Sequence, residues 1–315
     1  MKKRNFVMTL LAIGFLGCQN PKPKASENVN ISTENTEQPF LKSMEYSNLV
    51  DKATQEEVGE ALIAAGIDKQ LVGSFFENVN TFNQTVGEVG LVKEGFATSD
   101  DLIISYDEAS IQTQWDEKNP EFIGYNCRIT SFDMFRDLVS TGNPKGINSS
   151  NLFLDKDALN TNAKKVFSQE ENERFLCLFS RVLTGYHKDV AQHLEKVKQA
   201  FKEREVHFPY KGDTSKASLI SIFFHSAITD EPDDVFLFVG HVGVLVPMKD
   251  GKLLFVEKLA FQEPYQAIKF NNRTELNDYL MNRYDVEKGQ PTAKPFIMEN
   301  DELMQGYRPN PNNKE

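Results

Sequence analysis

The sequence predicts an α+β fold in which a helical first half is followed by an antiparallel sheet. Two observations predict this division. Between residues 50 and 203 the apolar residues recur at the spacing of helices, behind residues that favour helix starts. After residue 217 the chain holds runs of β-branched and aromatic residues, and two of these runs are joined by a three-residue loop that ends in glycine.

The composition excludes several classes of protein. The 315 residues include 46 acidic and 35 basic ones, which gives a net charge of −11. A nucleic-acid partner or electrostatic docking on anionic lipid would need a basic face, so neither is expected. Three cysteines, Cys18, Cys127 and Cys177, are too few for a disulfide-framework fold. No internal stretch is long and apolar enough to span a bilayer.

Residues 1–17 have the pattern of a secretion signal. Three basic residues at positions 2–4 precede a short apolar run over 6–16, and Gly17-Cys18 follows. This end resembles the lipobox of bacterial lipoproteins, which implies that Cys18 becomes the lipidated first residue after cleavage. An ordinary secretory signal with an incidental cysteine is the alternative. We therefore expect an extracytoplasmic protein that is lipid-anchored to the cell membrane.

The remaining chain divides into three parts. Residues 18–45 are rich in Asn, Ser, Thr, Glu and Pro. They have too little apolar surface to offset the conformational entropy lost on ordering, so they are expected to be a flexible tether. Residues 46–302 are expected to form a single α+β domain. Residues 303–315 have the polar composition of a frayed, disordered tail.

Capping patterns and apolar spacing predict the elements in order. Thr54 and Glu57 form a capping box that predicts a helix near 55–65, and Ser168 and Glu171 form another that opens a later helix. Further helices are expected over 70–83, 188–203 and 273–284. Strands are expected over 219–224, 235–246 and 253–261.

Cys127 is the candidate nucleophile. Asn126 is a good N-cap, so Cys127 would be the first residue of a helix whose apolar stripe is Ile129, Phe132, Phe135 and Val139. The thiol lies off that stripe and can face a cleft. The positive end of a helix and its free N–H groups stabilise a thiolate and a developing oxyanion. Two alternatives remain, an inert buried thiol or a disulfide with Cys177.

Cys177 and four of the five histidines are expected to have no part in catalysis. Cys177 lies in an apolar run, where burial raises the pKa of a thiol, and is expected in the core. His187, His193 and His207 lie in polar stretches and are expected to be solvated. His225 ends an apolar run and is expected to be a core or strand-end histidine.

His241 and Glu257 each interrupt an otherwise apolar strand. An imidazole in such a strand must find a partner or face a cleft. The loop 249–251 has glycine in its last position, as in a three-residue hairpin, and that register pairs Glu257 with Gly243 on the sheet face of His241. A two-residue turn would put Lys258 there instead. A core histidine and a solvated strand glutamate remain the alternatives.

No metal or cofactor site is predicted. The chain lacks HExxH, paired-histidine and CxxC spacings. The acidic stretches 155–157 and 230–234 lack the calcium-loop pattern, and are expected to be a helix start and a solvated turn.

The order of these candidates resembles that of the papain-like cysteine hydrolases, in particular the NlpC-type cell-wall peptidases. In that family a cysteine opens a helix, a histidine lies in a later strand and a polar residue lies in the next strand. The matching residues here are Asn126-Cys127-Arg128, His241–Val244 and Glu257, within roughly residues 120–262. The family has Asp before the cysteine and Ser-Gly after it, and this chain departs from both. Over its full length the chain also resembles an uncharacterised family of bacterial lipoproteins, through its YNCR and FVEKLAFQEPYQ stretches.

The resemblance implies a cell-surface cysteine hydrolase, an amidase or peptidase acting on cell-wall peptide or another extracellular amide. Cys127 would attack the carbonyl and His241 would transfer the protons, while Glu257 would hold the tautomer of the imidazole. Asn126 would cap the helix at the nucleophile. The alternative is a non-catalytic lipoprotein that binds a ligand or an envelope partner.

Overall fold

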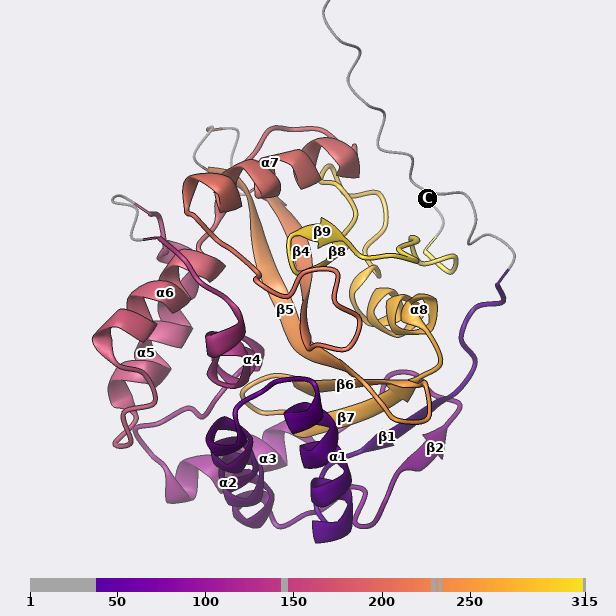
Figure 1. Ribbon diagram of the computed structural model, residues 1–315. Helices are drawn as coiled ribbons and strands as arrows, with labels where there is room; N and C mark the ends of the chain where they lie inside the picture. The colour runs from indigo at the N-terminus through magenta and orange to yellow at the C-terminus, as the bar shows by residue number, and fades with distance from the viewer. Residues whose placement is uncertain (1–37, 143–146, 228–230, 232–233, 314–315) are drawn as a thin grey trace, which may run out of the picture. The chain divides into compact units, whose positions relative to one another are not determined.

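Nine strands form one antiparallel sheet at the centre of the part of the chain that the structure describes (Figure 1). The computed structural model describes residues 38–142, 147–227, 231 and 234–313, which all belong to one unit, Glu34–Glu315. The strand order is β2-β1-β7-β6-β5-β4-β8-β9, and β3 pairs with β5. The strands are β1 (Met44–Ser47), β2 (Ala97–Ser99), β3 (Val182–Leu183), β4 (Ser218–Ala227), β5 (Val235–Pro247), β6 (Leu253–Lys258), β7 (Tyr265–Phe270), β8 (Phe296–Glu299) and β9 (Glu302–Leu303).

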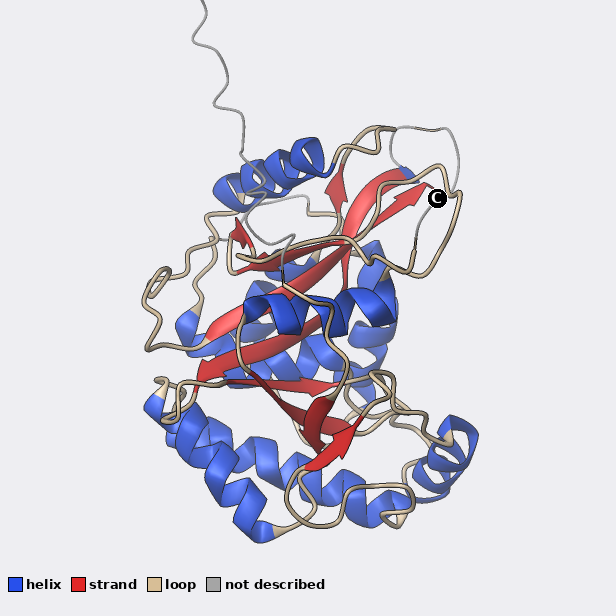
Figure 2. Ribbon diagram, turned by 90° about the vertical axis from the view of Figure 1, so that its right-hand side faces the viewer, coloured by secondary structure: helices blue, strands red, loops and turns tan. Residues whose placement is uncertain are grey.

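Eight α-helices within the described ranges surround this sheet, which confirms the α+β class. They are α1 (Lys52–Ala64), α2 (Lys69–Val86), α3 (Glu108–Lys118), α4 (Cys127–Phe135), α5 (Phe153–Thr161), α6 (Gln169–Phe179), α7 (Val190–Glu203) and α8 (Arg273–Tyr284). Figure 1 shows α8 on one side of the long strand β5 and α4 on the other, and Figure 2 shows helices both in front of the strands and behind them. None of these helices is long and apolar enough to cross a membrane.

The predicted division into two halves is correct for the helices but incomplete for the sheet. β1 and β2 lie in the first half and pair with β7 and with each other at the edge of the sheet. They are too short, at four and three residues, to produce a clear alternating pattern. The sheet is therefore built from both ends of the chain.

The two predicted capping boxes have different outcomes. Ser168 and Glu171 form the complete reciprocal box at the start of α6, as predicted. The box predicted at Thr54 is wrong, because α1 begins three residues earlier. Asp51 is its N-cap, and its carboxylate accepts a hydrogen bond from the Thr54 backbone N–H at 2.9 Å.

The predicted boundaries of the domain are corrected at both ends. Residues 303–313 pack on the domain, with Tyr307 buried and Arg308 paired with Asp278 of α8. The last residues of the predicted tether also pack, since the Leu41 backbone N–H donates to Asp278 at 2.9 Å. Polar composition did not reveal these contacts because a few buried side chains anchor each segment. The predicted signal peptide, Cys18 and the rest of the predicted tether lie outside the described residues.

Helix α4 lies in the core. Ile129, Phe132 and Phe135 of its predicted stripe are buried, but so are the residues between them, including Ser131 and Asp133. The fourth residue, Val139, is buried but has an extended backbone beyond the end of the helix, so the prediction that the helix reaches it is wrong. The hydroxyl of Ser131 donates to the Val242 carbonyl of β5 at 3.1 Å. The helix is therefore enclosed on more than one face, rather than resting on the sheet by a single stripe.

Candidate active site

Cys127 is the first residue of α4, as predicted. Asn126 has an extended backbone, and its side-chain oxygen accepts a hydrogen bond from the Ile129 N–H at 2.9 Å. This cap satisfies one donor of the first turn, while the N–H of Cys127 has no partner within the helix. The thiol therefore lies at the positive end of the helix dipole.

A buried ion pair fixes this helix start to two other elements. The Asp155 carboxylate of α5 is fully buried and accepts hydrogen bonds from Arg128 at 2.9 and 2.7 Å. It also accepts one from the Asn126 side-chain amide at 2.8 Å. Arg128 donates in turn to the Val239 carbonyl of β5 at 2.9 Å. Residues 155–157 lie at the start of a helix, as predicted, but the pairing of Asp155 with Arg128 was not predicted.

The β5–β6 hairpin has the predicted three-residue register. The Met248 N–H donates to the Lys252 carbonyl at 2.9 Å, and Gly251 adopts a left-handed φ of 86°. The ladder runs from Pro247–Leu253 to Val244–Val256 and ends one step before the predicted pair of Gly243 and Glu257. Glu257 still lies on the face that this register assigns to it.

A β-bulge lies directly before His241. Ile222 of β4 pairs with His241 and the next residue, Phe223, pairs with Val239, so Gly240 is the extra residue. A Cβ at Gly240 would lie 2.1 Å from the Phe224 ring, which explains why glycine fits here. Because a bulge turns the strand and redirects its side chains, it contributes to the orientation of His241.

His241 and Glu257 form a buried pair. Nε2 of His241 lies 2.5 Å from Oε2 of Glu257, and the two side chains are 1% and 0% exposed. Since Nε2 is occupied, Nδ1 is the ring nitrogen left for another partner. The ring of His241 also stacks on Tyr284 of α8, with centroids 5.1 Å apart.

The Cys127 thiol and the His241 imidazole shift each other's pKa in opposite directions. Burial alone would raise the pKa of Cys127, but the charge of His241, a hydrogen bond from it and the charge of Arg128 lower it overall. Burial alone would lower the pKa of His241, but Cys127 and then Glu257 raise it to about 9. These directions favour a thiolate beside an imidazolium.

Lys258, the residue that a two-residue turn would have placed beside His241, is buried elsewhere. Its ammonium donates to the carbonyls of Ala260 and Phe261 at 2.7 and 3.3 Å and to that of Glu263. It lies 3.9 Å from the centroid of the Phe82 ring. Burial lowers its pKa well below the usual value, but three carbonyl acceptors and a ring face fit the three donors of an ammonium.

Cys177 is a core thiol, as predicted. It is buried in α6, burial raises its pKa, and its sulfur lies 3.7 Å from the Arg204 carbonyl. Both Cys127 and Cys177 are free, so the disulfide alternative is wrong.

The other histidines are less solvated than predicted. His207 is exposed, as expected, and His225 is a buried strand residue, as expected. His193 is fully buried, with one ring nitrogen against the Thr184 hydroxyl at 2.8 Å, so its solvated assignment is wrong. The ring centroid of His193 lies 4.7 Å from that of His187 and 4.4 Å from that of His225. Within the described residues, no group of three or more His, Cys, Asp or Glu side chains is arranged to hold a metal ion.

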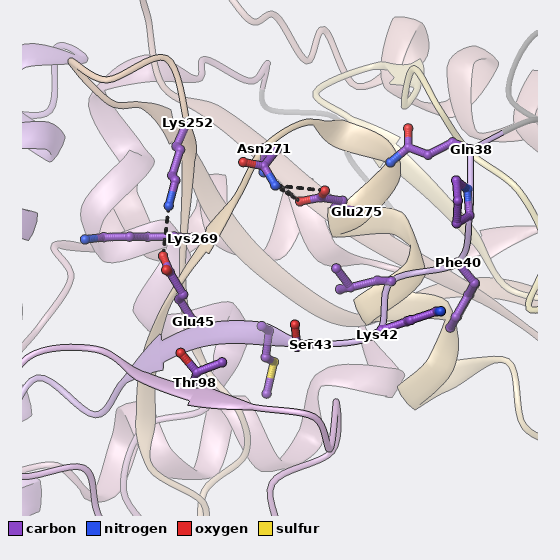
Figure 3. Close-up of a pocket in the computed structure, with 13 residues that line it drawn as sticks. Gln38, Phe40, Lys42, Ser43, Glu45, Thr98, Lys252, Lys269, Asn271 and Glu275 are labelled. Carbon is purple, nitrogen blue, oxygen red and sulfur yellow. Dashed lines mark hydrogen bonds and ion pairs between the residues drawn. The ribbon is translucent and has the colours of Figure 1, made fainter.

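A pocket of about 500 Å³ lies apart from these residues, where the segment 38–45 meets the start of α8 (Figure 3). Figure 3 shows Lys252 reaching Glu45, and Asn271 reaching Glu275. The lining contains neither Cys127 nor His241. Among its charged side chains, Lys252 pairs with Glu45, while Lys269 pairs with Glu57, which lies outside the lining.

Comparison with known proteins identifies a family but no function. The model of a family described as "Domain of unknown function (DUF4300)" matches residues 45–304. No curated protein and no solved structure gives a significant match. The matched range contains Cys127, His241 and Glu257, so the candidate site lies within the family's domain.

Proposed function

Because the chain belongs to the family described as a domain of unknown function (DUF4300), we propose its function from its site: the protein is a cysteine hydrolase, an amidase or peptidase with a papain-like arrangement. One observation carries the proposal. Cys127, His241 and Glu257 come from a helix start and two strands, and form a connected buried set in which the pKa of the thiol is lowered and that of the imidazole is raised. A cysteine needs this environment to act as a nucleophile at neutral pH.

The proposed reaction has two halves, acylation of Cys127 and hydrolysis of the resulting thioester, and Cys127 and His241 take part in both. The Cys127 thiolate attacks the amide carbonyl, and the carbonyl electron pair moves to oxygen, where the Cys127 backbone N–H stabilises it. When the tetrahedral intermediate collapses, the carbon–nitrogen bond breaks and His241 gives its proton to the leaving amine. Water then attacks the thioester, His241 takes its proton, and the acid product and the free thiolate are released.

Glu257 has an orienting part in this scheme. Its carboxylate accepts the Nε2–H of His241, which fixes the ring so that Nδ1 exchanges protons with the sulfur. The buried carboxylate also stabilises the imidazolium form. Arg128 adds positive charge near the sulfur, which also favours the thiolate.

The proposed site of action is outside the cytoplasm, at the surface of the cell membrane. The basic, apolar and Gly17-Cys18 pattern of the N-terminus supports a lipid anchor at Cys18. A hydrolase held there meets cell-wall peptide and other extracellular amides, which we propose as its substrates.

A non-catalytic lipoprotein that binds a ligand or an envelope partner is the second candidate. The burial of the candidate site favours this second candidate, because Cys127 is only 5% exposed and His241 only 1% exposed. A binding scaffold has no need for a reactive thiol, so the two candidates differ in thiol chemistry.

Thiol alkylation therefore tests the proposal. We expect iodoacetamide to modify Cys127 rapidly near neutral pH in a Cys177→Ala protein, and His241→Ala to slow that reaction. Cys127→Ala, with Cys177 intact, is the matched control and should show almost no modification, because Cys177 is buried with a raised pKa. Every protein used for alkylation also carries Cys18→Ala, which removes the third thiol. A Cys127 that reacts no faster than an ordinary buried thiol would favour the binding lipoprotein.

The proposed anchor has a separate test. Cys18→Ala should leave the precursor unprocessed by the lipoprotein pathway, so the variant keeps its first 17 residues and carries no lipid. A variant that is processed and fractionates like the wild type would exclude lipidation at Cys18.

A further inference from the structure

A chain of buried hydrogen bonds continues behind Glu257, away from His241. The Tyr279 hydroxyl of α8 donates to Oε1 of Glu257 at 2.5 Å and lies 3.3 Å from the side-chain oxygen of Gln266. The Gln266 amide donates to the Tyr106 hydroxyl at 2.5 Å, and the Asn48 amide donates to the same hydroxyl at 3.0 Å. The chain thus joins the candidate site to residues of the first half of the sequence.

Glu257 depends on this chain because both of its oxygens are buried. Oε2 faces His241 and Oε1 faces Tyr279, so each oxygen has one strong partner. A buried carboxylate that loses a partner either remains charged at a large cost or takes up a proton. In its protonated form it would no longer support an imidazolium.

Two elements hold the carboxylate from different directions. Gln266 is the cross-strand partner of Glu257 in the β6–β7 ladder, so both side chains lie on the same sheet face. Tyr279 comes from α8, where it is fully buried. The strand pairing places the carboxylate, and the helix supplies the donor that orients it.

We propose that Tyr279 is a positioning residue, which with Gln266 behind it holds the Glu257 carboxylate against His241. This inference rests on the proposed function, since it assigns Tyr279 a part in the same reaction. Tyr279 touches neither the sulfur nor the substrate carbonyl in that scheme. It acts only through Glu257.

Among the titratable groups around Glu257, Tyr279 is the one whose hydroxyl holds the carboxylate by a hydrogen bond. His241 of β5 occupies the other oxygen. Tyr284 of α8 and Tyr106 of the loop before α3 interact with Glu257 through charge. Among the described side chains, only His241 and Tyr279 hydrogen bond to this carboxylate.

The pH profile of Cys127 alkylation tests the proposal without requiring the natural substrate. The rate with iodoacetamide is measured from pH 4 to 10 in Cys177→Ala protein with and without Tyr279→Phe. The variant leaves Glu257 with one unpaired oxygen, so the carboxylate supports the imidazolium form of His241 less well. The thiolate form of Cys127 is then less favoured, and the pKa of the thiol rises. We expect the acidic limb of the profile to move up by roughly one pH unit, which is about fivefold slower alkylation at the wild-type midpoint.

Tyr307→Phe is the matched control. The Tyr307 hydroxyl is also buried and donates to the Pro295 carbonyl at 3.1 Å, but this bond lies outside the chain that leads to Glu257. Its loss should leave the alkylation profile unchanged. A Tyr279→Phe profile that matches that of Tyr307→Phe, even with a lower melting temperature, would make Tyr279 a structural residue and overturn the proposal.

The remaining outcomes are also decisive. If Tyr279→Phe fails to fold, Tyr106→Phe replaces it, because Tyr106 is only partly buried. The proposal then requires a smaller shift in the same direction, and the absence of a shift overturns it.

The profile also separates the two proposals. If the Cys127 thiol already titrates like an ordinary cysteine when Tyr279 is present, the proposed function fails first. If that thiol is activated and Tyr279→Phe leaves it so, the positioning role alone fails.

Discussion

Asp155 and Glu257 are two fully buried carboxylates, and each one holds a cation that lowers the pKa of the same thiol. Asp155 holds Arg128 and Glu257 holds His241. Charges in the core are costly unless they are paired and hydrogen-bonded, and both pairs meet that condition. The lowered pKa of the Cys127 thiol therefore depends on two cations, each of which is held in place by a buried acid.

Removal of one member of the first pair should be strongly destabilising. We expect Asp155→Ala to lower the free energy of unfolding by about 3 kcal/mol, because Arg128 is left as an unpaired cation with little access to solvent. Urea unfolding measures this change. The exposed pair Lys164–Glu77 is the control, since Glu77→Ala should change stability by less than about 1 kcal/mol. Equal losses in the two variants would contradict the importance of burial.

The raised pKa of His241 sets an upper pH limit for the proposed reaction. His241 must carry a proton to release the amine, and its folded-state pKa is about 9. Hydrolysis should therefore decline as the pH rises through about 9, and at low pH it should decline when the thiolate is protonated. The stability that His241 contributes is complete below its unfolded pKa of about 6.5 and is lost as the pH passes its folded pKa. Activity that still rises above pH 10 would contradict this assignment.

At the residue level, the sequence could reveal only those groups that break a local pattern. His241 and Glu257 interrupt apolar strands, and Cys127 follows a strong N-cap, so all three were predicted. Asp155 could not be recognised, because an acid in the first turn of a helix is common and is usually solvated. Tyr279 could not be recognised either, since a tyrosine in a helix next to a sheet is ordinary.

At the level of elements, the hairpin was predictable because its glycine and its length restrict the turn. Loop 249–251 sets the register, and the observed ladder follows it to Val244–Val256. The bulge at Gly240 was not predicted. The reason is physical: a bulge depends on the facing strand β4 and on the Phe224 ring, which lie outside the local sequence.

The bulge can be tested by filling it. We expect Gly240→Ala to displace the Phe224 ring, because the new Cβ would lie 2.1 Å from it. The displaced ring should lower the unfolding free energy by about 1–3 kcal/mol, as overpacking does, and slow the alkylation of Cys127 through His241. Gly73→Ala in α2 is the control, since no atom lies within 4 Å of its added Cβ. A Gly240→Ala protein as stable and reactive as the control would show that the bulge tolerates a side chain.

The packing of α7 on β4 should be sensitive to acid. His225 has its pKa lowered to about 4 by burial and by the charges of His193 and His187. Since the unfolded chain takes up the proton near pH 6.5, stability falls as the pH drops from about 6.5 towards 4. His225→Gln should reduce the difference in unfolding free energy between pH 7 and pH 5. An unchanged difference would assign the acid sensitivity to other groups.

At the level of the whole molecule, the sheet joins segments that are far apart in the sequence. β1 near the start pairs with β7, and β8 near the end pairs with β4. A sequence pattern reports local structure and not these distant pairings, so the order of the strands could not be predicted. The candidate site likewise joins distant segments, because Cys127 of α4 lies more than 100 residues before His241 of β5 and Glu257 of β6.

The two ends of the described chain stabilise the domain, in contrast to the predicted tether and tail. Deletion of residues 303–315 should lower the melting temperature by several degrees, since it removes the buried Tyr307 and the Arg308–Asp278 pair. Deletion of residues 19–33 should leave the melting temperature unchanged, because this polar segment has too little apolar surface to pack. Thermal unfolding of the two truncated proteins checks both expectations, and a loss of stability in the second would show that the tether docks.

Arg308 also determines where the two ends of the chain meet. Its guanidinium donates to the Gln38 carbonyl at 2.7 Å and pairs with Asp278 of α8, the same carboxylate that holds Leu41. The first and the last segments of the described chain are thus hydrogen-bonded to the same helix, α8. A pull on the chain ahead of Gln38 would therefore load Arg308 and α8 first.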